Sequence, residues 1–199
     1  MGEGPGGCIF LPMVGLLRIA KGIDGLSRRV GKMVAWLTLI MVLVGAYNAI
    51  ARYLERDLGL SLSSNAYVEL QWYLFSLVFL LGAPYTLRCD RHVRVDVIYG
   101  GHPPLAKAWI DLVGGVLILL PFCAFAIWAS TDFVIDSWNQ REMSSDPGGL
   151  PRYPLKTVVP IAFFLVGLQG ISEIIKRLAI IRGMSPESVG LEEIEEGEA

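Results

Sequence analysis

Charged residues are scarce in this sequence, and histidine and cysteine are scarcer still. Only 18% of the residues are Asp, Glu, Lys or Arg, whereas 53% are hydrophobic. A typical soluble domain has about a quarter of its residues charged. The composition therefore favours a membrane protein over a soluble domain.

The few cysteines and histidines do not form a recognisable metal or haem site. Cys8, Cys89 and Cys123 make no CxxC pair, so we expect free thiols and no metal. His92 and His102 fall in one short loop, whereas a membrane haem protein usually has histidine ligands on facing spans. We expect no cofactor. The net charge of −2 gives no indication of nucleic-acid binding.

Four long stretches contain no charged residue. A charge at the bilayer centre costs about 2.5 to 3.5 kcal/mol, and about 20 helical residues cross a hydrocarbon core of about 30 Å. The predicted fold class is an all-α integral membrane protein with four transmembrane helices, at about residues 31–54, 67–88, 106–134 and 157–181. The charge-free stretches are Met33 to Ala51, Leu70 to Leu87, Leu112 to Thr131 and Thr157 to Ser172.

The basic residues are distributed unevenly along the chain. Twelve of the 17 Lys and Arg residues precede the first span, lie between the second and third, or follow the fourth. The other two loops hold the remaining five. Because cytoplasmic loops are enriched in Lys and Arg, both termini are predicted to be cytoplasmic.

The two ends of the chain flank a predicted membrane domain at residues 30–182. In residues 1–29, apolar residues recur at three-to-four spacing with basic residues between them, which predicts an amphipathic helix on the cytoplasmic leaflet. Its basic side would face anionic membrane lipid. A partly ordered leader is the alternative. Residues 183–199 contain six glutamates and are predicted to be a disordered acidic tail.

Two loops carry most of the polar residues that could have a function. The predicted cytoplasmic loop packs acids and bases between valines, so its charges can pair locally. Its candidate residues are Arg88, Asp90, Arg91, His92, Arg94 and Asp96. The candidates in the predicted outer loop are Trp138, Glu142, Ser144, Pro147, Gly148, Gly149, Pro151 and Lys156.

On these two loops, the sequence resembles the small permease subunits of the tripartite ATP-independent periplasmic (TRAP) transporters. The resemblance covers roughly residues 36–182. It implies a bacterial inner-membrane complex with a large permease subunit, which holds the substrate and ion sites. It also implies a periplasmic substrate-binding protein that delivers an organic acid for ion-driven uptake. The cytoplasmic loop would then be a structural or subunit-interface loop, and the outer loop would dock the binding protein.

Polar residues near the spans favour a supporting role within such a transporter. The charged positions lie at span ends, and amides at positions such as Asn48, Gln71 and Gln169 typically join helices. A self-contained homodimeric four-helix carrier is the alternative, and it needs a polar or charged residue near mid-span. No enzyme activity is expected, since Asp132, Asp136 and Glu142 are interpreted as solvated or lysine-paired.

Two prolines fall inside the predicted spans. Pro84 and Pro121 would each bend a helix. The bend could shape a groove for a partner, or the backbone could adjust locally around the proline.

Overall fold

The computed structural model describes residues 7–58, 63–89, 101–185 and 189, and these ranges contain helices and no strand. Four helical stretches are long and apolar enough to cross a membrane, namely Met13–Glu55, Asn65–Arg88, Leu105–Asn139 and Tyr153–Ile181. The predicted all-α class with four transmembrane helices is confirmed. The elements are α1 (Gly7–Leu58), α2 (Asn65–Arg88), α4 (Pro104–Gly114), the π-helical segment η1 (Gly115–Leu119), α5 (Leu120–Asn139) and α6 (Tyr153–Ile181).

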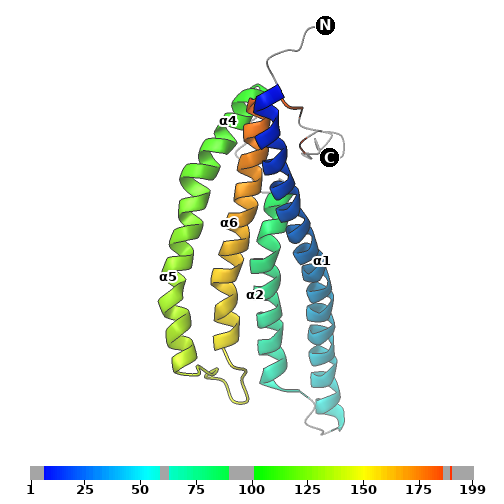
Figure 1. The fold of residues 1–199 in the computed structure, drawn as a ribbon. Coiled ribbons are helices and arrows are strands. Elements are labelled where there is room, and N and C mark those ends of the chain that lie inside the picture. Colours follow the sequence, from blue (N-terminus) through cyan, green and yellow to red (C-terminus); the bar gives the residue numbers. More distant parts are fainter. Residues whose placement is uncertain (1–6, 59–62, 90–100, 186–188, 190–199) are drawn as a thin grey trace.

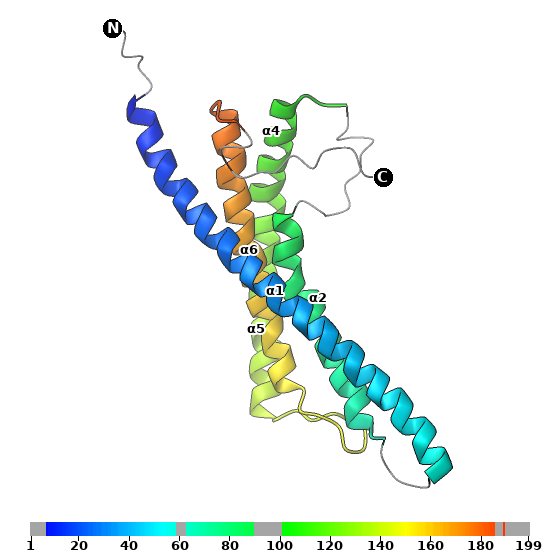
Figure 2. The same ribbon diagram turned by 90° about the vertical axis from the view of Figure 1, so that its right-hand side faces the viewer.

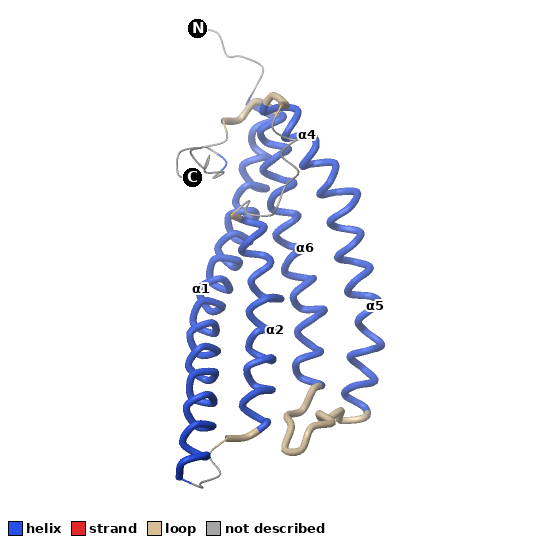
Figure 3. Tube along the Cα trace, turned by 180° about the vertical axis from the view of Figure 1, so that it is seen from behind, coloured by secondary structure: helices blue, strands red, loops and turns tan. Residues whose placement is uncertain are grey.

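The four spans stand in a row with α6 in a central position. α5, α6, α2 and α1 follow one another across the molecule (Figure 1), and α6 packs against α1, α2, α4 and α5. The view from behind shows that the described loop joining α5 to α6 lies at the end opposite to the start of α1 (Figure 3). α6 therefore contacts more of the other helices than any other element does.

α1 crosses the other helices obliquely (Figure 2), and most of its buried positions follow a seven-residue repeat, with Ala51 as the exception. Met13, Ala20, Ser27 and Asn48 are all buried and are separated by multiples of seven. A seven-residue repeat keeps one side of a helix against its neighbours along a slightly inclined path. The first part of α1 meets α6, and the later part meets α2.

The N-terminal segment is continuous with the first span. α1 has 52 residues, which at about 1.5 Å per residue makes it about 78 Å long, far more than a bilayer core needs. Residues 7–29 are thus helical and extend the span without a break. The position of this extension on the cytoplasmic leaflet stays a prediction.

Local sequence signals set several helix ends. Ser64 caps α2 by accepting a hydrogen bond from the Ala66 N–H, at 3.3 Å. α6 ends at Ile181, and Gly183, two residues later, has a φ of 91°, which suits glycine. The Gly183 N–H donates to the Ile180 carbonyl and the Met184 N–H to the Ala179 carbonyl, at 2.9 and 3.1 Å. These bonds form the turn that commonly stops a helix.

The third span is interrupted by one π-helical turn. η1 directly precedes Leu120 and Pro121, and the Leu120 N–H donates to the Gly115 carbonyl, five residues back. Proline has no N–H to continue the regular α-helical ladder. The backbone around Pro121 thus adjusts locally. Local adjustment was one of the two alternatives for this proline, the other being a bend that shapes a groove for a partner.

The predicted acidic tail falls almost entirely outside the described residues. Residues 186–188 and 190–199 are not described, so the prediction of disorder is untested there. Val189 is described, and it is buried against Met13 and Ala179. The chain therefore returns to the start of α1 after α6 ends.

Candidate functional site

The loop between α5 and α6 folds back on itself as a small hairpin. Met143 pairs with Pro151 in an isolated antiparallel bridge. The Ser144 N–H donates to the Leu150 carbonyl at 3.2 Å, and the Arg152 N–H to the Glu142 carbonyl at 2.9 Å. Gly148 has a φ of 74°, a conformation that glycine adopts without strain, and it lies in the turn of this hairpin.

Glu69 of α2 fixes the hairpin to the helices. Its carboxylate accepts hydrogen bonds from the Ser144 hydroxyl and, at 2.6 Å, from the Leu150 N–H. The Tyr73 hydroxyl, one turn further along α2, donates to the Leu150 carbonyl at 3.2 Å. Glu69 is only 6% exposed. A buried carboxylate needs such donors, so the hairpin and the start of α2 depend on each other.

Gly149 allows this close approach. A Cβ atom at Gly149 would clash with the Ser144 side chain and would lie 2.9 Å from Oε2 of Glu69. A larger residue would therefore separate the hairpin from α2. Glycine at this position is required by the contact between the two elements.

Glu142 makes the second anchor of the loop, between α5 and α6. It accepts a hydrogen bond from the Ser137 hydroxyl at 2.8 Å and pairs with the ammonium of Lys156. The Lys156 ammonium also lies 3.9 Å from the ring centroid of Phe133. Two hydrogen bonds lower the pKa of Glu142 below its ordinary value, and the one from Lys156 has a larger effect than the one from Ser137.

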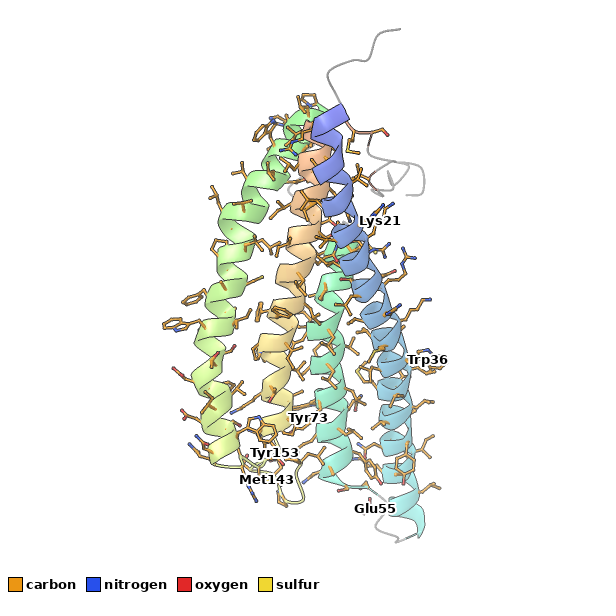
Figure 4. All side chains as sticks on the ribbon, viewed as in Figure 1. Lys21, Trp36, Glu55, Tyr73, Met143 and Tyr153 are labelled. Atoms are coloured by element: carbon orange, nitrogen blue, oxygen red, sulfur yellow. The ribbon has the colours of Figure 1, made fainter. Side chains whose placement is uncertain are left out.

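The loop candidates from the sequence gather into one region. Figure 4 shows Tyr73, Met143 and Tyr153 at this end of the molecule. Trp138 donates from Nε1 to the Thr157 hydroxyl at 2.8 Å, and its ring lies 4.6 Å from that of Tyr153, centroid to centroid. We name Glu69, Ser137, Glu142, Ser144 and Lys156 the hairpin cluster.

Seven of the eight predicted loop residues fall into two groups, and the eighth, Pro151, is half-buried and pairs with Met143. Glu142, Ser144, Gly149 and Lys156 face the helices and hold the loop in place. Trp138, Pro147 and Gly148 are exposed. Glu69 and Tyr73, which also hold this loop, lie in α2 and are not among the eight residues predicted from the loop sequence.

A second polar cluster joins α1 to α6. Lys176 is 2% exposed, and its ammonium lies 2.8 Å from both the Asp24 and the Glu173 carboxylates. Gln169 is fully buried and donates to Asp24 and Glu173 at 2.9 and 3.1 Å. Its carbonyl accepts from the Ser27 hydroxyl at 2.7 Å. The prediction that Gln169 joins helices is confirmed.

Ser172 completes this arrangement, which we name the α1–α6 cluster: Asp24, Ser27, Gln169, Ser172, Glu173 and Lys176. The Ser172 hydroxyl lies within hydrogen-bond distance of the Ala20 carbonyl, at 3.2 Å, and of the Asp24 carboxylate, at 2.8 Å. Ala20 is 1% exposed, so the two backbones approach closely here. Such internal pairing is what buried charges need in an apolar environment.

The α4 segment is tied to α6 by a further ion pair. The Arg177 guanidinium lies 3.1 Å from the Asp111 carboxylate. Within the described part of the chain, no three His, Cys, Asp or Glu side chains are grouped so as to hold a metal ion. The chemistry of both clusters is therefore that of ion pairs and hydrogen bonds between helices.

The other two amides noted in the sequence lie near the contact between α1 and α2. Gln71 packs so closely on Gly45 that a Cβ atom there would lie 2.7 Å from Nε2 of Gln71. It also lines a shallow groove of about 530 Å³ with Met41, Trp72 and Phe75. Asn48 is buried, and its Oδ1 has no hydrogen-bond donor among the described residues.

The predicted cytoplasmic loop is outside the described residues, except at its start. Arg88 is the last residue of α2. Asp90, Arg91, His92, Arg94 and Asp96 belong to residues 90–100, which are not described. Their role as an interface or structural loop therefore stays a prediction.

Comparison with known proteins identifies the family of this four-helix chain. Residues 24–179 match the model of the DctQ component of the tripartite ATP-independent periplasmic transporters. The chain is 27% identical over 165 residues to the ectoine TRAP transporter small permease protein TeaB of Halomonas elongata, covering 82% of each chain. No solved structure is a significant match. The matched region includes the second and third spans and most of the first and fourth, so this chain belongs to the family of TRAP transporter small permease proteins.

Proposed function

We propose that the chain is a fixed supporting subunit, which packs beside a large permease that moves the substrate. The observation that carries this proposal is the pairing of charged side chains within the hairpin and α1–α6 clusters, which tie helices together at different levels. The charge-free stretches of the four spans contain no Asp, Glu, Lys or Arg that could take part in substrate or ion transfer. Helices joined in this way favour a rigid unit over one that rearranges during transport.

The substrate proposed for the complete transporter is an organic acid delivered by a periplasmic binding protein, with uptake driven by an ion gradient. Specificity would then reside in the binding protein and the large permease. The test is uptake into vesicles that contain the chain, the large permease and an ion gradient, with binding protein added outside. The substrate panel should include organic acids, and ectoine because the relative from Halomonas elongata carries that name.

The same vesicle experiment separates the supporting role from a self-contained carrier. Vesicles with this chain alone should show no uptake, and vesicles that lack only this chain should lose most of it. Uptake by the chain alone would favour a homodimeric carrier. Purification from the native membrane should retain the large permease as a partner of this subunit.

The proposed orientation places both termini and residues 89–103 in the cytoplasm. It is supported by the unequal distribution of Lys and Arg along the chain. The start of α1 and the end of α6 also lie at the same end of the molecule (Figure 1). Reporter fusions after His102 and Ser185 should report the cytoplasm, and a fusion after Asp57 the periplasm. A periplasmic signal at His102 or Ser185 would reverse the assignment.

We further propose that the segment from Arg88 to Tyr99 contacts the large permease. Its density of acids and bases in a short loop supports this assignment. Arg91→Ala, His92→Ala and Asp96→Ala should each reduce the amount of large permease that copurifies, whereas the exposed Arg52→Ala should not. Wild-type assembly and uptake in all three loop variants would contradict the proposal.

The hairpin between α5 and α6 is proposed to dock the binding protein. Its inward side chains hold the loop, so the docking contacts should come from its exposed residues, such as Met143 and Pro147. Met143→Ser and Pro147→Ala should weaken binding-protein affinity while the hairpin stays folded. Asp132→Asn is the control, since Asp132 is exposed and lies within α5, before the loop begins. Deleting Gly148 and Gly149 without loss of affinity would contradict docking at this loop.

A further inference from the structure

Five basic residues form one continuous stripe along the first part of α1. At about 100° per residue, their positions fall within an arc of about 100° around the helix axis. The stripe consists of Arg18, Lys21, Arg28, Arg29 and Lys32, and all five side chains are exposed. In Figure 4 the Lys21 side chain points away from the other helices. We call this surface the basic stripe.

These cations differ from the three described cations that form ion pairs. Lys156 pairs with Glu142, Lys176 with Asp24 and Glu173, and Arg177 with Asp111. Among the described residues, no carboxylate lies in ion-pair distance of any member of the basic stripe. The stripe therefore presents positive charge that the described part of the protein does not neutralise.

The helix that carries the stripe is fixed in orientation. Its buried side, with Ala20, Asp24 and Ser27, is joined to α6 by the α1–α6 cluster. On another side of the same segment, Ile19, Leu26 and Met33 are exposed, at 57%, 41% and 62%. One side is thus bound to protein, one is apolar and one is basic, which is the arrangement of a helix at a membrane surface.

The oblique path of α1 shortens the stripe along the direction of the other spans. From Arg18 to Lys32 the stripe is about 21 Å long, whereas each headgroup layer is only about 5 to 7 Å thick. An upright helix would carry most of these charges out into water. Figure 2 shows α1 inclined to the other spans, so a longer part of the stripe stays near the headgroups.

We propose that the basic stripe is a binding surface for anionic phospholipid headgroups. Guanidinium and ammonium groups at this level pair with lipid phosphates, while the exposed apolar side chains enter the acyl region. The surface would hold a layer of anionic lipid against α1. This inference concerns the subunit itself and does not depend on its role in uptake.

The test measures the thermal stability of the full chain in a neutral detergent with added phospholipid. Phosphatidylglycerol should raise the melting temperature, and phosphatidylcholine should not. Arg28→Gln with Arg29→Gln should weaken the apparent affinity for phosphatidylglycerol by about 30-fold at low salt, because each basic residue near an anionic surface contributes about a fivefold factor. The effect should shrink at high salt.

A matched variant controls for net charge. Arg52→Gln with Arg182→Gln also removes two exposed cations, but from outside the stripe, and should keep the full response to phosphatidylglycerol. Equal loss in both double variants would overturn the proposal. The melting temperature of each variant without lipid identifies any general loss of folding. If the stripe variant does not fold, the single variants Lys21→Gln and Lys32→Gln provide the same comparison.

Two further outcomes would assign the stripe to another partner. A stabilising effect of soluble glycerophosphate equal to that of the lipid would overturn the membrane assignment. Val189 packs on Met13, so the acidic residues that follow it in sequence are a second source of negative charge. A chain that ends at Val189 should respond to phosphatidylglycerol as the full chain does. A response seen only after this truncation would assign the stripe to the tail.

Discussion

Asp24 and Lys176 form an ion pair of 2.8 Å between the first and the last helix of the chain. The Lys176 side chain is almost fully buried, with 2% of its surface exposed. Glu173 and Gln169 complete the contacts around the pair. The two residues are far apart in sequence and lie on different helices. Substitutions in this pair therefore test whether charge holds α1 against α6.

Replacing Lys176 by methionine should destabilise the subunit by about 3 to 5 kcal/mol. The change keeps the length of the side chain but leaves two carboxylates, those of Asp24 and Glu173, without their cation. The double variant Asp24→Asn, Lys176→Met should be more stable than Lys176→Met alone. Thermal unfolding in detergent measures both. The exposed Arg182→Met is the control and should change little.

Glu69→Ala should release the hairpin from α2. The Leu150 N–H and the Ser144 hydroxyl would lose their acceptor, so hydrogen exchange at Leu150 should become at least roughly tenfold faster. Exchange in the region of the α1–α6 cluster should be unchanged. Asp132→Ala, which removes an exposed carboxylate of α5, should leave exchange at Leu150 as in the wild type. Unchanged exchange in Glu69→Ala would show that the hairpin is held by other contacts.

The anchor at Glu142 should weaken in acid. Because its folded-state pKa is lowered by Lys156 and Ser137, the carboxylate stabilises the loop fully above its ordinary pKa of about 4.3. This stabilisation is lost as pH falls through the lowered folded-state value. The Trp138 indole N–H resonance, assigned with Trp138→Phe, should report the change. In Glu142→Gln this pH dependence should disappear.

Gly31→Ala should disturb the contact between α1 and α2. A Cβ atom at Gly31 would lie 2.6 Å from Cγ of the Tyr85 ring, which cannot move without shifting the side chain or the helix. Overpacking of this kind costs about 1 to 3 kcal/mol. Gly82→Ala is the matched control at the same interface, since its Cβ would meet Val34 at 3.7 Å, an ordinary contact distance. Equal stability of the two variants would contradict this account of the interface.

Charge-free stretches were sufficient to predict the four helices, because the bilayer excludes charge from long segments regardless of tertiary contacts. The buried role of Lys176 could not be predicted in the same way. In sequence it follows the last charge-free stretch and resembles a loop lysine. Only the packing of α1 on α6 brings Asp24 to it.

In the loop between α5 and α6, too, the local turn could be predicted from the sequence, whereas the tertiary contact could not. Pro147, Gly148 and Gly149 indicated a turn, because glycine and proline favour turns whatever surrounds them. The acceptor for the hairpin, Glu69, is at the start of another helix. A carboxylate at the end of a span is ordinary in sequence, and its partners depend on how α2 lies beside the loop.

The tie between α1 and α6 has a consequence for the order of synthesis. Asp24 emerges from the ribosome 145 residues before Gln169, and still earlier relative to Lys176. Until α6 is made, Asp24 and Ser27 of α1 lack the α6 side chains with which they pair in the finished structure. The contacts of the N-terminal half of α1 therefore form only after the last helix has been synthesised. An incomplete chain would therefore carry an unpaired Asp24, a difference by which quality-control proteases could distinguish it from the finished subunit.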